Sequence, residues 1–144
     1  DKNISPLLET LTQFGQQTLI AQEFIPEIIE GDKRVFIIGG EVFPYALNRI
    51  PSQGSIRGNL AAGGGAKVVE INANDRKICT ELKAELLKRE LFFVGIDIIG
   101  PYLTEINITS PTCAREIEKE TGLSVCHNFF EFVEKYSVTL GKHL

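Results

Sequence analysis

Two acidic residues and one amide have the types and spacing of a metal site. They lie in residues 91–109, where two apolar, β-branched runs flank Gly100-Pro101, a pattern that predicts an antiparallel hairpin. Side chains alternate faces along a strand, so Glu105 and Asn107 share one face. If the hairpin loop has an odd number of residues, Asp97 lies opposite Glu105 on that face. The spacing then brings three oxygen-bearing side chains together.

Carboxylates that face each other across a strand pair need a counter-ion. Without one, two such charges repel and destabilise the pair. A Mg²⁺ ion between the two carboxylates replaces this repulsion by attraction, because Mg²⁺ takes one or two carboxylates, water and substrate phosphates as ligands. The sequence therefore predicts a magnesium site on this hairpin. A hairpin with one solvent-exposed polar face is the alternative interpretation.

The distribution of charge along the chain indicates an anionic ligand. A net charge of −4 over 144 residues argues against a nucleic acid or an acidic membrane as partner. Residues 31–69 nevertheless carry a local charge of +3. The cations are Lys33, Arg34, Arg49, Arg57 and Lys67, and the anions are Asp32 and Glu41. A basic segment beside an acidic metal site suits an anion that arrives with its own metal.

The cysteines and the apolar runs favour a cytoplasmic chain. Cys79, Cys113 and Cys126 show no CxxC spacing, and their odd number argues against a secreted disulfide framework. No apolar run approaches the roughly 18 residues of a membrane span, and no signal-peptide pattern is present at the start. Because the sequence starts at Asp1 without Met, we expect a fragment or a processed piece of a longer chain.

A strand end supplies a candidate nucleotide contact. Residues 18–25 are predicted to form a strand that stops at Pro26. Exposed backbone groups at such an end could hydrogen-bond an adenine, while Phe24 and Ile25 add apolar contact. An ordinary strand end is the alternative.

Arginines mark two segments that could hold an anion. Arg34 lies at the start of a second predicted hairpin around Gly39-Gly40. An arginine can bind a carboxylate or a phosphate through two parallel hydrogen bonds. A solvated charge pair with Lys33 is the alternative. Residues 48–67 form a long glycine-rich stretch with Arg49 and Arg57, which we interpret as a lid; a mobile surface loop is the alternative.

Helical signals complete the predicted fold. They cover residues 5–14, 75–87 with Asp75 as cap, 113–118 before Gly122, and 126–138. Together with the two hairpins they predict an α+β fold, a mostly antiparallel sheet with helices packed against one face.

Six segments occur in the order and spacing found in bacterial glutathione synthetases. They are residues 22–26, 31–35, 48–51, 57–64, 93–100 and 104–113. The most specific are Arg-Gly-Asn-Leu-Ala-Ala-Gly-Gly at 57–64 and Glu-Ile-Asn-Ile-Thr-Ser-Pro-Thr-Cys at 105–113. The chain resembles this family, which belongs to the ATP-grasp superfamily, over nearly its whole length. The resemblance implies ATP-dependent ligation of γ-glutamylcysteine and glycine to glutathione through an acyl phosphate.

The resemblance also implies roles for individual residues. Mg²⁺, with Mn²⁺ as an alternative, would be held by Glu105 and Asn107, with Asp97 as a further ligand. Gln22, Glu23, Phe24 and Ile25 would line the adenine site, and Asp32 would contact the nucleotide. Arg34 and Arg49 would bind the peptide substrate or the transferring phosphoryl group. Residues 50–65, with Arg57, would close over the acyl phosphate.

The chain departs from the family pattern in two places. After Gly64 the family pattern continues with Arg, where this chain has Gly65, followed by Lys67. The family's amino-terminal domain and the first half of its ATP-grasp domain, with two lysines and a glycine-rich loop that grip ATP phosphates, have no counterpart here. We therefore expect residues 1–144 to be the carboxy-terminal part of an ATP-grasp domain, inactive when isolated. A homo-oligomer would form through the full-length enzyme.

Two other functions fit the same residues. One is a different ATP-grasp carboxylate-amine ligase, and the other is a noncatalytic domain that binds a nucleotide or a partner.

Overall fold

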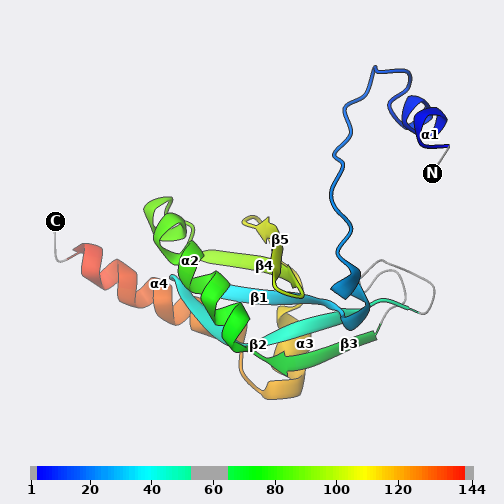
Figure 1. The fold of residues 1–144 in the computed structure, drawn as a ribbon. Coiled ribbons are helices and arrows are strands. Elements are labelled where there is room, and N and C mark those ends of the chain that lie inside the picture. The colour runs from blue at the N-terminus through cyan, green and yellow to red at the C-terminus, as the bar shows by residue number, and fades with distance from the viewer. Residues whose placement is uncertain (1–2, 53–64, 142–144) are drawn as a thin grey trace.

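Five strands form one antiparallel sheet in the computed structural model, which describes residues 3–52 and 65–141. The strands are β1 (Asp32–Ile38), β2 (Glu41–Ile50), β3 (Gly65–Glu70), β4 (Phe93–Ile99) and β5 (Tyr102–Asn107). Their spatial order is β3-β2-β1-β4-β5, and all neighbouring pairs are antiparallel. β1 is therefore the central strand (Figure 1).

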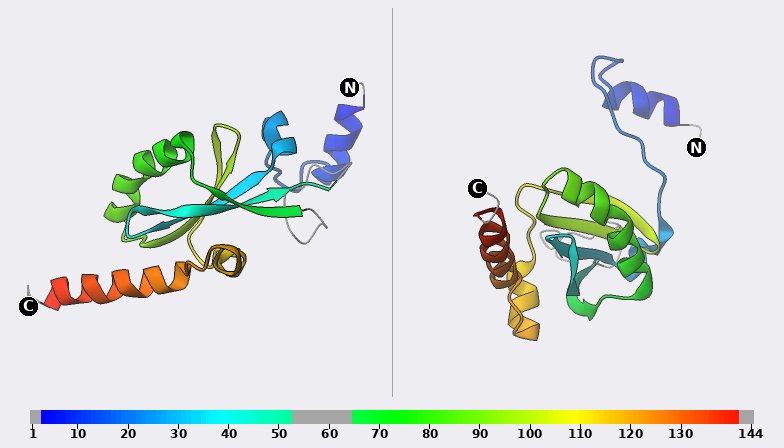
Figure 2. Two further views of the ribbon diagram at one scale, coloured as in Figure 1. Left: turned by 90° about the horizontal axis from the view of Figure 1, so that it is seen from below. Right: turned by 90° about the vertical axis from the view of Figure 1, so that its left-hand side faces the viewer.

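Helices cover both faces of this sheet. They are α2 (Ala73–Lys88), α3 (Ala114–Thr121) and α4 (Val125–Gly141), while α1 (Ile4–Leu11) and the 3₁₀ helix η1 (Pro26–Glu30) precede β1. Figure 2 shows α2 on one face and α3 with α4 on the other. The predicted α+β class and antiparallel sheet are confirmed, but the prediction that the helices pack against one face is wrong. Among the described residues, no helix has both the length and the apolar character needed to cross a bilayer.

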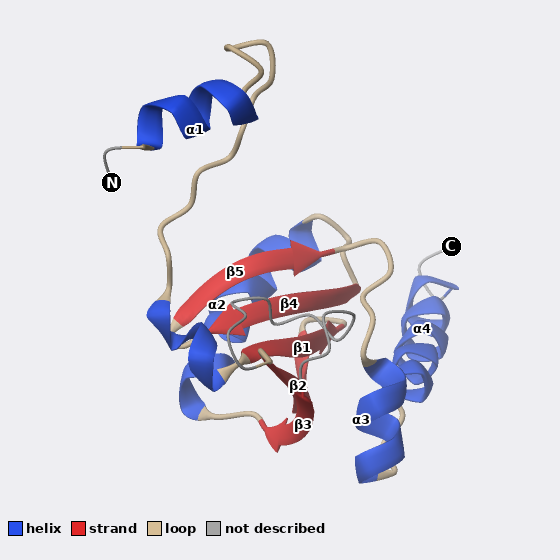
Figure 3. Cartoon of the chain, turned by 90° about the vertical axis from the view of Figure 1, so that its right-hand side faces the viewer, coloured by secondary structure: helices blue, strands red, loops and turns tan. Residues whose placement is uncertain are grey.

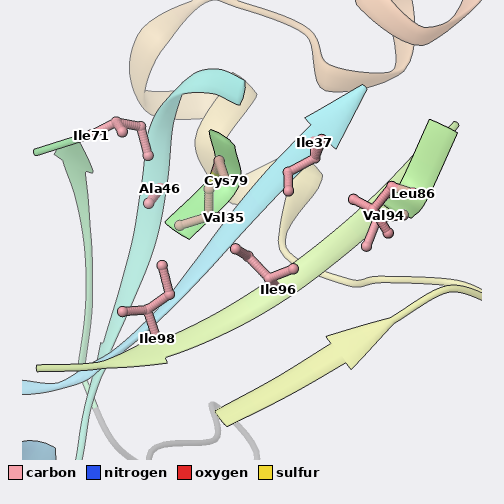
Figure 4. Packing of buried hydrophobic residues seen from close by; sticks show 9 residues of the cluster. All are labelled: Val35, Ile37, Ala46, Ile71, Cys79, Leu86, Val94, Ile96 and Ile98. Atoms are coloured by element: carbon pink, nitrogen blue, oxygen red, sulfur yellow. The ribbon is translucent and has the colours of Figure 1, made fainter. Parts of the chain in front are cut away.

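The apolar pattern of β1 explains the two helical layers. Its last four residues, 35–38, are all buried. Val35 and Ile37 belong to the core under α2, which Leu86 completes (Figure 4). Phe36 and Ile38 point to the opposite face and join the core under α3 and α4. A strand that is apolar at successive positions needs cover on both sides.

Local turn and cap chemistry determines where two elements begin. Gly39 and Gly40 form the predicted hairpin turn, with φ of 58° and 83° that glycine adopts without strain. Helix α2 begins at Ala73, so the predicted cap at Asp75 is wrong by three residues. Asn72 is the N-cap: its side chain accepts from the Asp75 N–H at 2.9 Å, while the Asp75 carboxylate accepts from the Asn72 N–H at 3.1 Å.

Residues 18–25 do not form the predicted strand. They belong to no ladder in the part of the chain that the structure describes. Figures 1 and 3 show them running from the sheet out to α1. A strand needs a neighbouring backbone to satisfy its N–H and C=O groups, so β-favouring side chains alone were insufficient.

Candidate metal and anion site

One row of side chains crosses three strands on the face that carries α3 and α4. Arg34 of β1 pairs with Asp97 of β4, and Asp97 pairs with Glu105 of β5. Asn107 pairs with Gly95, two residues further along the same hairpin. These three strands lie side by side in Figure 3. The expected placement of Asp97 opposite Glu105 is confirmed.

A β-bulge produces that register. The connection at Gly100-Pro101 has two residues, since Ile99 pairs with Tyr102. The register then shifts by one residue between Asp97 and Ile98, which leaves Thr104 as the extra residue. The hydroxyl of Thr104 donates to the carbonyl of Asp97 at 3.1 Å. The bulge thus replaces the odd loop on which the sequence prediction depended.

Buried charges of alternating sign extend from this row. Arg34 donates from Nε to Asp97 Oδ1 at 2.5 Å and from Nη2 to Oδ2 at 2.8 Å. Arg49 Nη2 lies 2.9 Å from Asp97 Oδ2 and 2.6 Å from Asp32 Oδ2. Arg34, Arg49 and Asp97 are 5%, 8% and 3% exposed. The structure therefore brings together Asp32, Arg34, Arg49 and Asp97 as one network.

The network shifts the pKa values of its two acids in opposite directions. Burial alone would raise the pKa of Asp97, but hydrogen bonds from Arg34 and Arg49 outweigh it and hold the pKa below its ordinary value. Burial raises the pKa of Asp32 to about 6, against the attraction of Arg49. Asp32 Oδ1 is buried and has no hydrogen-bond partner among the described residues. Asp32 is therefore the acid with an acceptor still available.

Glu105 and Asn107 supply the exposed half of the candidate metal site. Asn107 Nδ2 donates to Glu105 Oε1 at 2.8 Å. Among the described ion pairs, none neutralises Glu105. The described ranges hold no cluster of three or more His, Cys, Asp or Glu that could bind a metal. A cation here would need the Asn107 amide oxygen in addition to the carboxylates, an all-oxygen set that suits Mg²⁺.

The predicted adenine residues line a cavity beside the β4–β5 hairpin. The cavity has a volume of about 480 Å³ and is lined by Glu23, Phe24, Ile25, Pro26, Glu27, Tyr102 and Leu103. An adjoining cavity of about 380 Å³ includes Gln22 and Thr104. Both volumes are in the usual range for small-molecule sites. The structure thus brings residues 22–25 to the hairpin that carries Glu105.

Sequence reasoning missed four residues that line the larger cavity: Pro26 and Glu27, which follow the predicted set, and Tyr102 and Leu103 of β5. Tyr102 and Leu103 are 54% and 37% exposed on the edge strand β5. The available sequence signal for Tyr102 and Leu103 was their position just after the Gly100-Pro101 turn. That position does not indicate that residues 22–25 lie beside them. Arg57 and most of the predicted lid lie outside the described residues.

Comparisons with known proteins identify the family of the chain. The family described as prokaryotic glutathione synthetase, ATP-grasp domain, matches residues 1–122. The chain is 51% identical over 138 residues to a glutathione synthetase of Neisseria meningitidis serogroup A, covering 96% of this chain and 43% of that protein. It is 56% identical over 119 residues to a glutathione synthetase of Pseudomonas aeruginosa, covering 83% of this chain and 38% of that protein.

The chain thus spans less than half the length of these curated relatives. A solved structure of the ATP-grasp ligase PsnB with a precursor variant, Mg and ADP aligns over 72% of this chain and 32% of that chain, with a TM-score of 0.49 and 16% identity. The match to the family domain covers most of the chain. The chain belongs to the prokaryotic glutathione synthetase family, and the part of that family that it matches is the ATP-grasp domain.

Proposed function

We propose that this chain forms the metal-binding part of an ATP-dependent ligase that joins γ-glutamylcysteine and glycine to give glutathione, ADP and phosphate. The observation that best supports this is the row Arg34–Asp97–Glu105, which places buried guanidinium groups next to an acidic edge. Family membership supports the reaction class. ATP is the co-substrate in this proposal.

The arginines would act on the first chemical step. In that step a carboxylate oxygen of γ-glutamylcysteine attacks the γ-phosphorus of ATP, and the bond to the ADP oxygen breaks. Arg34 and Arg49 would hold the attacking carboxylate or stabilise the charge on the transferring phosphoryl group. Their burial favours this role, since fixed donors in a dry site stabilise charge more strongly than donors in water.

In the second step the amine of glycine attacks the acyl carbon, and inorganic phosphate leaves. The acyl phosphate is sensitive to water, so a cover over the site has a physical purpose. Residues 50–65 with Arg57 would form that cover.

Glu105, Asn107 and Asp97 would hold Mg²⁺, with Mn²⁺ as a substitute. When bound, the ion neutralises charge on the ATP oxygens. Gln22, Glu23, Phe24 and Ile25 would receive the adenine in the 480 Å³ cavity. Asp32 would contact the nucleotide. This assignment places nucleotide and metal on the same hairpin.

We further propose that residues 1–144 are the carboxy-terminal part of an ATP-grasp domain, because they cover only 43% and 38% of the relatives named above. The rest of the enzyme would grip the ATP phosphates, so the isolated chain would be inactive. The full-length enzyme would act in the cytoplasm, and any homo-oligomer would form through it.

Phosphate release by the full-length protein tests the proposal. The assay contains ATP and Mg²⁺, and γ-glutamylcysteine or glycine is omitted in turn. Release that requires both substrates supports glutathione synthesis. Release that requires another acid or amine instead indicates a different ATP-grasp ligase, and no release with any pair indicates a noncatalytic domain.

A further inference from the structure

The 3₁₀ helix η1 forms part of the wall of both cavities beside the β4–β5 hairpin. It contributes Pro26 and Glu27 to the cavity of about 480 Å³, and Ile28 to the adjoining cavity of about 380 Å³. The hairpin supplies the facing wall, with Leu103 in both cavities. The separation between η1 and the hairpin therefore sets the width of the space between them.

Gly100 allows η1 to approach the hairpin closely. It lies in the turn between β4 and β5 with φ of 55°, a conformation that glycine adopts without strain. A methyl group on Gly100 would lie 2.9 Å from both Cβ and Cγ of Glu27. Non-bonded carbon atoms pack best at about 3.5–4.0 Å, so this methyl group would overlap Glu27. Because the backbone of η1 fixes the position of Cβ, rotation of the Glu27 side chain cannot relieve the overlap, and η1 or the turn would have to move.

Asn48 of β2 holds the other end of η1. Its Nδ2 donates to the carbonyl of Glu30, the last residue of η1, at 2.9 Å. Gly31 follows with φ of 118°, and a methyl group there would overlap the side-chain amide of Asn48. η1 is therefore held near one end by close contact with the β4–β5 turn and at the other end by a hydrogen bond to β2.

We infer that Gly100 and Asn48 are positioning residues for the nucleotide, because they hold η1 at the distance from the β4–β5 hairpin that fits the adenine. This inference rests on the function proposed above. Neither residue belongs to the described lining of the two cavities, so each acts through η1. Their effect is therefore on nucleotide affinity and not on the turnover number at saturating ATP.

Matched variants Gly100→Ala and Gly122→Ala in the full-length protein separate this effect from backbone strain. Both glycines have positive φ, but a methyl group on Gly122 would meet no described atom within 4 Å. The measured quantities are kcat, the KM values for ATP and glycine, and the ATP affinity by calorimetry without the other substrates. In Gly100→Ala we expect the KM for ATP to rise and the ATP affinity to fall about tenfold or more, while kcat and the KM for glycine change less than about twofold. In Gly122→Ala all four quantities should stay within about twofold of wild type.

Asn48→Ala tests the other end of η1 without a new overlap or a strained φ. Loss of the hydrogen bond to Glu30 should lower the ATP affinity about threefold or more at unchanged kcat. This variant also decides the inference if circular dichroism shows that Gly100→Ala is unfolded.

Unchanged ATP affinity in Asn48→Ala or in folded Gly100→Ala would overturn the inference, as would an equal loss of affinity in Gly100→Ala and Gly122→Ala. If wild type binds ATP but releases no glycine-dependent phosphate, the proposed function fails, while the ATP affinities of the variants still decide the roles of Gly100 and Asn48. If wild type binds no ATP, the inference is overturned.

Discussion

Asp97 and Glu105 face each other across the β4–β5 ladder, and of these two acids Asp97 alone forms a described ion pair with an arginine. Glu105 therefore lacks a described ion pair at the edge of the sheet, and it interacts with the charge of Arg34 only at longer range. That asymmetry makes Glu105 the more informative residue to change.

Glu105→Gln should leave the stability of the metal-free protein nearly unchanged and weaken its affinity for divalent cations. The repulsion between facing acids is about 0.2–1 kcal/mol, and the attraction between Glu105 and Arg34 offsets it. The free energy of unfolding is measured in urea without metal, and the affinity for Mn²⁺ by titration. Glu70→Gln is the control, because Glu70 is also an exposed strand residue and pairs with Tyr45 instead of an acid. A variant that is less stable than wild type and binds Mn²⁺ equally well would contradict this expectation.

Asp32 should make the protein less stable as pH rises from about 4 to about 6. Its pKa is raised from 3.8 to about 6 in the folded state, so over this interval the unfolded chain loses its proton first. The loss is on the order of 2–3 kcal/mol, since one pKa unit corresponds to about 1.4 kcal/mol. Below this interval both states are protonated, and the penalty is absent.

The difference in unfolding free energy between Asp32→Asn and wild type isolates this effect. It should increase in favour of the variant from pH 4 to pH 7 and then stay level. Asp97→Asn should show the opposite sign at lower pH, because the pKa of Asp97 is lowered in the folded state. A difference for Asp32→Asn that is independent of pH would show that the burial of Asp32 has no such cost.

Asp75→Ala should destabilise the protein by about 2–4 kcal/mol. Asp75 is fully buried, completes the capping box of α2 and forms an ion pair with Lys33 of β1. The variant loses the cap and leaves a mostly buried lysine without its partner. Lys77→Ala is the control: its pair with Glu81 spans 4.0 Å on the surface, so the cost should stay below about 0.5 kcal/mol. Equal costs in urea denaturation would contradict the assigned role of Asp75.

The sequence predicted those features that depend on local chemistry. The Gly39-Gly40 turn needs only residues that adopt positive φ, and both glycines do so. Alternation along β5 was sufficient to place Glu105 and Asn107 together. The prediction that Asp97 lies opposite Glu105 depended on the length of the hairpin loop. A bulge at Thr104 has no sequence signature comparable to a Gly-Gly turn, so the register could not be predicted with certainty from the sequence.

The Arg34–Asp97 pair was beyond sequence reasoning. The two residues are 63 positions apart, and nothing local indicates that β1 pairs with β4. The same limit explains the error at residues 18–25, where strand-like composition has no described partner strand. Burial is likewise set by the whole fold, so the raised pKa of Asp32 had no local signal.

Glycine-dependent phosphate release by the full-length protein tests the central claim most directly. Wild type, the double variant Glu105→Gln with Asn107→Ala, and Glu70→Gln are compared with ATP, Mg²⁺, γ-glutamylcysteine and glycine, after circular dichroism has confirmed their fold. We predict turnover in wild type and Glu70→Gln, and a loss of about a hundredfold or more in the double variant, equivalent to about 2.7 kcal/mol of transition-state stabilisation. Turnover in the double variant equal to that of Glu70→Gln would contradict the claim that this edge of the sheet binds the catalytic metal.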